Sequence, residues 1–191
     1  MKRILAFGLL AVAVALAPAA RATTYVSHLT GDQESPPTGS LGTGDVTLIV
    51  ADDLSTMRIL ASFTGLSGNS AAAHIHCCIV PAGPPNVGVA TMTPSFVDFP
   101  LGVTSGTYDH TFDLTAAASY NSAFIGAGTV LDARTALLGG IAGGTAYFNI
   151  HSSTSPGGEI RGFFTVAPEP ASLLSLGLGV GLLALARRRA A

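Results

Sequence analysis

Residues 145–166 read TAYFNIHSSTSPGGEIRGFFTV, and this stretch decides the class of fold that the sequence predicts. Thr145–His151 and Glu159–Val166 are rich in β-branched and aromatic residues, which are typical of β-strands. Ser152–Gly158 between them consists of serine, threonine, proline and glycine, the residues that favour turns. The stretch therefore predicts an antiparallel hairpin.

The same pattern recurs along the chain between polar turn segments. It predicts further strands at residues 24–29, 44–50, 57–63, 72–80, 88–92 and 106–114. Thr115–Ile125 is alanine-rich after a threonine suited to an N-cap, and Val130–Ile141 has apolar residues near helical spacing. We therefore expect an all-β antiparallel fold, a Greek-key sandwich or barrel, with a short helical insertion at about 115–141.

The first 22 residues have the layout of a secretory signal peptide. Lys2 and Arg3 precede an apolar run from Ile4 to Ala17, and Ala20-Arg21-Ala22 is a small-x-small cleavage site. A retained membrane anchor is the alternative, but the run is short for a bilayer, which needs roughly 20 apolar residues. We expect cleavage after Ala22 and an exported protein.

The last 25 residues form a second targeting signal. Pro168-Glu169-Pro170 is followed by an apolar segment at 171–186, and Arg187, Arg188 and Arg189 close it. Such a segment crosses the membrane with its arginines on the cytoplasmic side. The three-part order resembles the PEP-CTERM sorting signal of Gram-negative bacteria. That resemblance implies an inner-membrane-tethered precursor, processing by an exosortase, and a final location at the cell surface or outside the cell; a plain C-terminal anchor is the alternative.

Between these signals, residues 23–166 suit one domain with an unusual charge balance. It has three arginines, no lysine, and an excess of Asp and Glu. Such a surface repels nucleic-acid phosphates, and the absence of lysine excludes Schiff-base catalysis and a P-loop.

Residues 71–80, AAAHIHCCIV, contain two of the five histidines and both cysteines of the chain, side chains that can bind a metal ion or form a disulfide. On a strand, Ile75, Cys77 and Ile79 share one face, which reads as core, and His74, His76 and Cys78 share the other. His151 lies on the polar face of its own strand, so adjacency of the two strands would bring it near His74 and His76. These side chains then form either a Cu or Zn site or a structural cluster bonded to loop carbonyls or carboxylates.

The two cysteines are adjacent, which leaves three alternatives for Cys77 and Cys78. They form a vicinal disulfide, they stay as thiols, or Cys78 is a metal ligand. The disulfide requires the strand to end at Cys77, because neighbouring side chains of a regular strand point in opposite directions. The oxidising compartment favours it.

Several of these motifs together resemble the chordin-type (CHRD) domain. They are Ala73-His74-Ile75-His76, the loop with Val87-Gly88-Val89-Ala90, and Ala146–His151 followed by Pro156–Gly162. The resemblance covers most of residues 23–165 and implies an extracellular β-sandwich module without established enzymatic activity. Cys77-Cys78 departs from the glycine and proline that many members carry after His-x-His.

Glu159 and Arg161 are two residues apart on the second hairpin strand and share a face. We expect their charges to pair with each other or with neighbours, and a Glu–Arg pair beside His151 would orient the imidazole. We interpret them first as a structural cluster.

The function expected from the sequence is therefore a non-enzymatic, surface-sorted CHRD module with no catalytic residues. Its expected partners are the exosortase and an extracellular polysaccharide or surface protein, but not nucleic acid. The alternative is a redox-related Cu or Zn protein with a superoxide-dismutase-like barrel. The binuclear dismutase site needs more histidines than the five present, and His28 and His110 are isolated.

Overall fold

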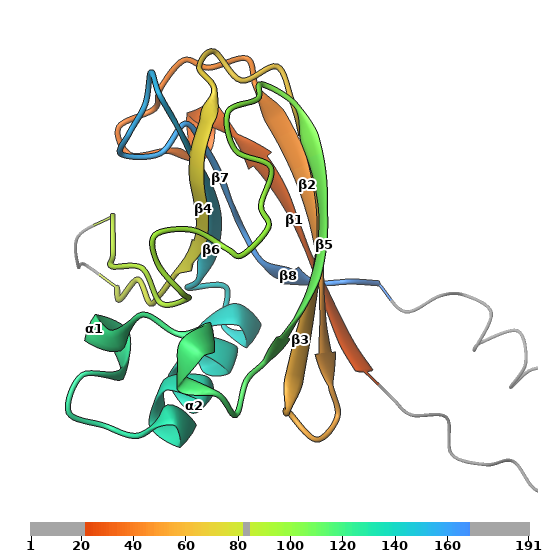
Figure 1. Ribbon diagram of the computed structural model, residues 1–191, viewed down its shortest axis with the longest axis vertical. Coiled ribbons are helices and arrows are strands. Elements are labelled where there is room, and N and C mark those ends of the chain that lie inside the picture. Colours follow the sequence, from red (N-terminus) through yellow and green to blue (C-terminus); the bar gives the residue numbers. More distant parts are fainter. Residues whose placement is uncertain (1–21, 82–84, 169–191) are drawn as a thin grey trace, which may run out of the picture.

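The computed structural model describes residues 22–81 and 85–168, and their strands form one antiparallel sheet that curls into a half-barrel (Figure 1). The order is β4-β6-β7-β1-β2-β3-β5, with β8 paired to β1. The strands are β1 (Ala22–Thr30), β2 (Thr43–Ala51), β3 (Thr56–Thr64), β4 (Ser70–His76), β5 (Gly106–Asp113), β6 (Tyr147–Ser152), β7 (Ile160–Phe163) and β8 (Thr165–Val166). The predicted all-β antiparallel class is confirmed.

The helical insertion is also confirmed, and it closes one end of the half-barrel (Figure 1). It comprises the short turn η2 (Ala117–Ser119), α1 (Ser122–Ile125) and α2 (Val130–Ala142); a further turn, η1 (Gly31–Gln33), follows β1. Thr129 caps α2, since its hydroxyl accepts from the Asp132 amide and the Asp132 carboxylate accepts from the Thr129 amide. Leu137 and Ile141 of α2 are buried in the core.

Period-two burial explains why the strands pack as they do. In β2, Val46, Leu48 and Val50 point inward and are almost fully buried, while the residues between them are more exposed. Phe96, from the segment between β4 and β5, packs in the core between β6 on one side of the half-barrel and β5 on the other. Its ring lies 5.6 Å from the Phe148 ring of β6 and 5.2 Å from the Phe112 ring of β5.

Two strand predictions are wrong in part. Residues 88–92 form no strand; Val89 and Thr91 make isolated bridges to His76 and Tyr120. These bridges go to different partners, so no continuous ladder develops there. The strand predicted at 72–80 ends at His76, after which the Ile79 amide bonds to the Thr145 carbonyl instead. Ile79 is consequently half-buried rather than a core residue.

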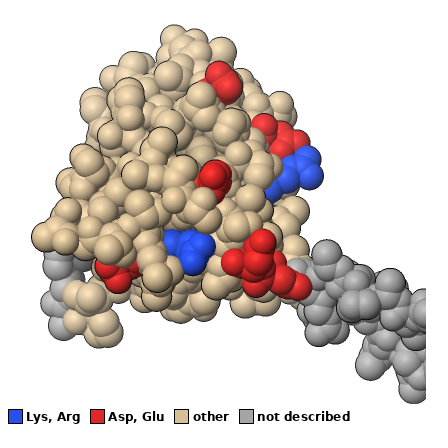
Figure 2. Space-filling view, turned by 60° about the horizontal axis from the view of Figure 1, so that its bottom comes forward, with Lys and Arg blue, Asp and Glu red and all other residues tan. Residues whose placement is uncertain are grey.

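Charged side chains are sparse on the surface, and the face in Figure 2 is mostly uncharged with scattered Asp and Glu. Arg58 pairs with Asp109 at 2.6 Å on the exposed side of the sheet. Arg161 is buried and lies 3.7 Å from the Glu34 carboxylate.

The predicted targeting signals at 1–22 and 167–191, with the span at 171–186, lie outside the described residues except for Ala22, Ala167 and Pro168. Within the described ranges, no helix combines the length and the apolarity that crossing a membrane would require.

Candidate metal centre

The pairing of β4 with β6 gathers three histidines on one face of the sheet. His74 lies opposite Asn149, and His76 lies opposite Tyr147, two residues along each strand. His151 follows two residues after Asn149 and shares its face. The ring centroids of His151 lie 5.2 Å from those of His74 and 5.6 Å from those of His76. The structure thus brings together the three histidines singled out in the sequence.

A backbone carbonyl fixes the tautomer of each imidazole. Because a carbonyl oxygen only accepts, the ring nitrogen facing it carries the hydrogen. His74 donates from Nε2 to the Pro94 oxygen at 2.7 Å. His76 donates from Nδ1 to Val87 at 2.8 Å, and His151 from Nδ1 to Pro156 at 2.9 Å. The remaining nitrogens are His74 Nδ1, His76 Nε2 and His151 Nε2, each with a free lone pair.

In these tautomers, the nitrogens that keep their lone pairs lie close together and none of them carries a hydrogen. Nε2 of His76 and Nε2 of His151 are 3.4 Å apart, and neither carries a proton to share in the tautomers fixed above. Nδ1 of His74 is buried and has no hydrogen-bond partner. One ring nitrogen from each of the three residues lies within 4.8 Å of the other two. Buried acceptors without donors are costly, so this arrangement favours a cation between them.

Burial also keeps these imidazoles neutral. It lowers the pKa of His74 and of His76 to about 4, against the opposing effect of their carbonyl partners. Burial lowers the pKa of His151 as well. Neutral imidazoles are the form that binds metal ions, so the histidines are ready to bind at neutral pH.

The separation fits a tetrahedral or trigonal metal ion. Two nitrogens bound at about 2.05 Å with a tetrahedral angle lie roughly 3.3 Å apart. The 3.4 Å between the Nε2 atoms of His76 and His151 matches this value. Three imidazoles suit copper and zinc. In the described part of the chain, no further His, Cys, Asp or Glu joins the group.

An aromatic ring and an arginine stack behind one of the three histidines. The Tyr147 ring stacks on the His76 imidazole at 5.0 Å, with an angle of 7° between the planes. The guanidinium carbon of Arg161 lies 4.7 Å from the centroid of the Tyr147 ring. A column of Arg161, Tyr147 and His76 therefore connects the centre to the buried ion pair with Glu34.

Glu159 and Arg161 are both buried, but each has partners of its own. The Glu159 carboxylate accepts from the Ser67 amide at 2.5 Å and from the Ser40 hydroxyl at 2.6 Å. Arg161 donates to the Gln33 carbonyl and, at 2.8 Å, to Asn86. His151 is oriented by Pro156, so the expected orienting Glu–Arg pair beside it is not formed. The two residues instead fasten loops to the hairpin.

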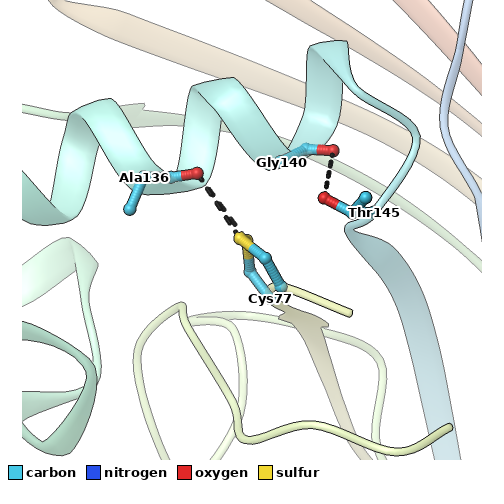
Figure 3. Close-up of a disulfide and its surroundings, with 5 residues drawn as sticks. Cys77, Ala136, Gly140 and Thr145 are labelled. Atoms are coloured by element: carbon cyan, nitrogen blue, oxygen red, sulfur yellow. Dashed lines mark hydrogen bonds between the residues drawn. A yellow bond between two sulfur atoms is a disulfide. The ribbon is translucent and has the colours of Figure 1, made fainter. Parts of the chain in front are cut away.

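Cys77 and Cys78 form a vicinal disulfide that packs against α2 (Figure 3). The sulfur atoms lie 3.7 Å and 3.5 Å from the Ala136 carbonyl oxygen, and these are packing contacts because a disulfide carries no S–H. A side chain at Gly140 would collide with both sulfurs. Cys78 therefore faces the helix and is not among the donors that the histidines gather.

His28 and His110 lie elsewhere. His28 is exposed and bonds to Asp45 at 2.8 Å. His110 lies between the rings of Tyr108 and Phe112 on β5. A surface hollow of about 420 Å³ lies over β2, β3 and β5 and has no histidine in its lining, and His28 lines a second hollow of about 450 Å³ over β1 and β2.

Sequence reasoning missed two members of this region. Glu34, the partner of Arg161, lies in an irregular segment whose residues carry no pattern that could predict burial. Tyr147 shares a face of its strand with Asn149 and His151 because it lies two and four residues before them, but this spacing does not reveal that its ring stacks on His76.

These observations define a class of protein. It is an antiparallel half-barrel with two histidines on β4 and a third on the neighbouring hairpin of β6 and β7. The family model of the CHRD domain matches residues 25–164, and the chain belongs to the CHRD domain family. No curated protein matches the chain, and no solved structure does.

Proposed function

We propose that this protein is an exported CHRD binding module whose functional group is a mononuclear copper or zinc centre held by His74, His76 and His151. One observation carries the proposal: one ring nitrogen from each of three buried or half-buried imidazoles lies within 4.8 Å of the other two, and Nε2 of His76 is 3.4 Å from Nε2 of His151. The CHRD domain is a binding or structural module, and nothing in the described residues indicates catalysis.

The competing interpretation is a purely structural histidine cluster. Such a cluster would gain stability by pairing each ring nitrogen with a donor or an acceptor. Here each imidazole uses only one nitrogen in that way, and the buried Nδ1 of His74 has no partner. A metal ion satisfies all three remaining lone pairs at once, which favours the binding interpretation over the structural one.

We predict that the full chain, exported and purified without an affinity tag, retains or takes up one copper or zinc ion per molecule. Replacing His76 by alanine removes one of three ligands, so the metal content should fall at least tenfold. Elemental analysis after dialysis measures it, and circular dichroism of the metal-free protein checks the fold. His28→Ala is the matched control and should keep its metal, because His28 is exposed, bonds to Asp45 and does not belong to the group of three histidines.

A wild-type protein that stays free of metal after incubation with Cu(I), Cu(II) and Zn(II), while folded, would overturn the metal-binding proposal. Equal metal content in His76→Ala and His28→Ala would place the metal elsewhere.

We also propose that the domain reaches the cell surface through its two terminal signals. The basic start and apolar run before Ala22 support export, and Pro168-Glu169-Pro170 followed by an apolar span and three arginines supports exosortase processing. At the surface, an extracellular polysaccharide or a surface protein would be the partner.

Changing Glu169 and the flanking prolines to alanine should leave an unprocessed precursor in the inner membrane, because the recognition tripeptide is lost while the apolar span remains. Fractionation with intact-mass analysis of the native host follows both forms. A matched variant with alanine in place of Ser172 and Ser175 keeps the tripeptide and should be processed normally. Processing of both variants to the same mature mass would contradict the sorting proposal.

A further inference from the structure

We infer that the three-histidine centre selects copper in its monovalent state, Cu(I), over Cu(II) and Zn(II). This inference rests on the proposed metal site and specifies the ion that it takes. Its basis is the charge of the donors, the charge of their surroundings and the number of ligands.

The donor set brings no negative charge to the ion. His74, His76 and His151 are neutral, and neither a carboxylate nor a thiolate belongs to the group in the described residues. The two cysteine sulfurs are bonded to each other and face α2. The partners that orient the imidazoles are backbone carbonyls rather than carboxylates, so they add no negative charge either. A divalent ion would therefore keep its full double charge.

Buried Arg161 places a positive charge close to one of the ligands. Arg161 stacks on Tyr147, which stacks on His76, and its positive charge opposes protonation of that imidazole. The Glu34 carboxylate lies 3.7 Å from Arg161 and offsets part of this charge. The buried Glu159 carboxylate accepts from Ser40 and Ser67 and not from an imidazole.

Burial makes the second charge of an ion expensive. His74 and His76 are only 5% and 8% exposed. The desolvation cost of an ion grows with the square of its charge, so a divalent ion loses roughly four times as much as a monovalent one in the same surroundings. An additional positive charge nearby increases the difference.

The ligand number points in the same direction. Zn(II) sites are almost always four-coordinate, and Cu(II) favours a tetragonal arrangement of ligands. The described residues supply three nitrogens and no fourth donor of the usual metal-binding types. Three neutral nitrogens in one cluster complete the coordination of a monovalent copper ion without recruiting water into a buried site.

The test uses the full exported chain under anaerobic conditions. Cu(I) affinity is measured by competition with a colorimetric Cu(I) chelator, and Cu(II) and Zn(II) affinities by competition with chelators of those ions. We expect Cu(I) to bind at least 100-fold more tightly than either divalent ion. A 100-fold preference over Cu(II) raises the reduction potential of bound copper by roughly 120 mV above that of the free ion, because tenfold corresponds to about 59 mV for one electron.

Glu34→Gln provides a variant that touches no ligand. It removes the carboxylate that pairs with Arg161, so at pH 8 the potential of bound copper should rise further. Asp45→Asn removes the same charge from an exposed position and should leave the potential unchanged. A merely structural role of Glu34 would not move the potential.

The outcomes separate the two proposals. If no copper or zinc binds stoichiometrically, the metal site itself fails and this inference with it. If Cu(II) or Zn(II) binds as tightly as Cu(I), the preference for Cu(I) is overturned while the metal site stands. If Glu34→Gln and Asp45→Asn both keep the potential of the wild type, the charge of Arg161 is overturned as a cause of the preference.

Discussion

Replacing Gly162 by alanine is expected to lower the free energy of unfolding by about 3 kcal/mol or more, the upper part of the range for overpacked sites. Gly162 lies in β7, where the hairpin strand crosses close to β1. A Cβ there would collide with the His28 carbonyl oxygen and lie 2.5 Å from the Ser27 hydroxyl. The first of these is backbone held in the sheet and cannot move aside without breaking the pairing of β1 with its neighbours.

The matched control is Gly157→Ala in the turn of the same hairpin. Nothing lies within 4 Å of the Cβ position of Gly157, and its backbone needs no left-handed conformation. Urea unfolding of both variants, followed by circular dichroism, measures the difference. If the two variants unfold at the same urea concentration, then the close approach of β7 to β1 does not limit the residue at this position.

The second large effect concerns Glu34, whose replacement by glutamine should stabilise the protein at pH 8. Burial raises the pKa of Glu34 from 4.5 to about 7, although Arg161 and the Ser35 amide oppose it. Ionised Glu34 is thus costly in the folded protein, and glutamine keeps the size of the side chain without the charge. The difference between the two pKa values corresponds to about 3 kcal/mol.

The direction of the pH dependence follows from proton binding. Between pH 4.5 and about 7 the folded state holds more protons on Glu34 than the unfolded state does, so the contribution of Glu34 to stability falls as pH rises through this window. Above pH 7 the contribution stays at its low value. The histidines of the metal centre act in the opposite direction, since burial lowers their pKa values.

Unfolding free energies of the metal-free wild type and of Glu34→Gln at a series of pH values isolate this contribution, because the histidine terms are common to both proteins. The advantage of the variant should grow from pH 4.5 to 7 and then stay constant. A difference that does not change with pH, or one that favours the wild type at pH 8, would mean that the ion pair with Arg161 outweighs the burial of the carboxylate.

The sequence predicted those parts of the fold that depend on periodicity. Alternating burial in β2 and β3 follows from residue order, and the polar faces of the two strands led to the expectation that His151 approaches His74 and His76. The strand predicted at 88–92 failed because Val89 and Thr91 each find a different single partner. Such choices depend on which distant segment is near, and no local pattern encodes them.

The same limit explains what was missed at the candidate site. Arg161 donates to the carbonyl of Gln33, which is the neighbour of Glu34 and lies 128 residues away in sequence. The alternatives for the cysteines could not be separated in the sequence because the deciding contact is with Ala136 and Gly140 of α2. Contacts of this kind arise from the path of the chain in space rather than from residue order.

The three carbonyls that hold the imidazoles come from the main chain of two connections, with Val87 and Pro94 between β4 and β5 and Pro156 between β6 and β7. Every amino acid supplies a carbonyl, so side chains in these loops can diverge between relatives without disturbing the histidines. A change of loop length, in contrast, moves the oxygen itself. Evolution of this centre should therefore tolerate substitutions in the loops far better than insertions or deletions.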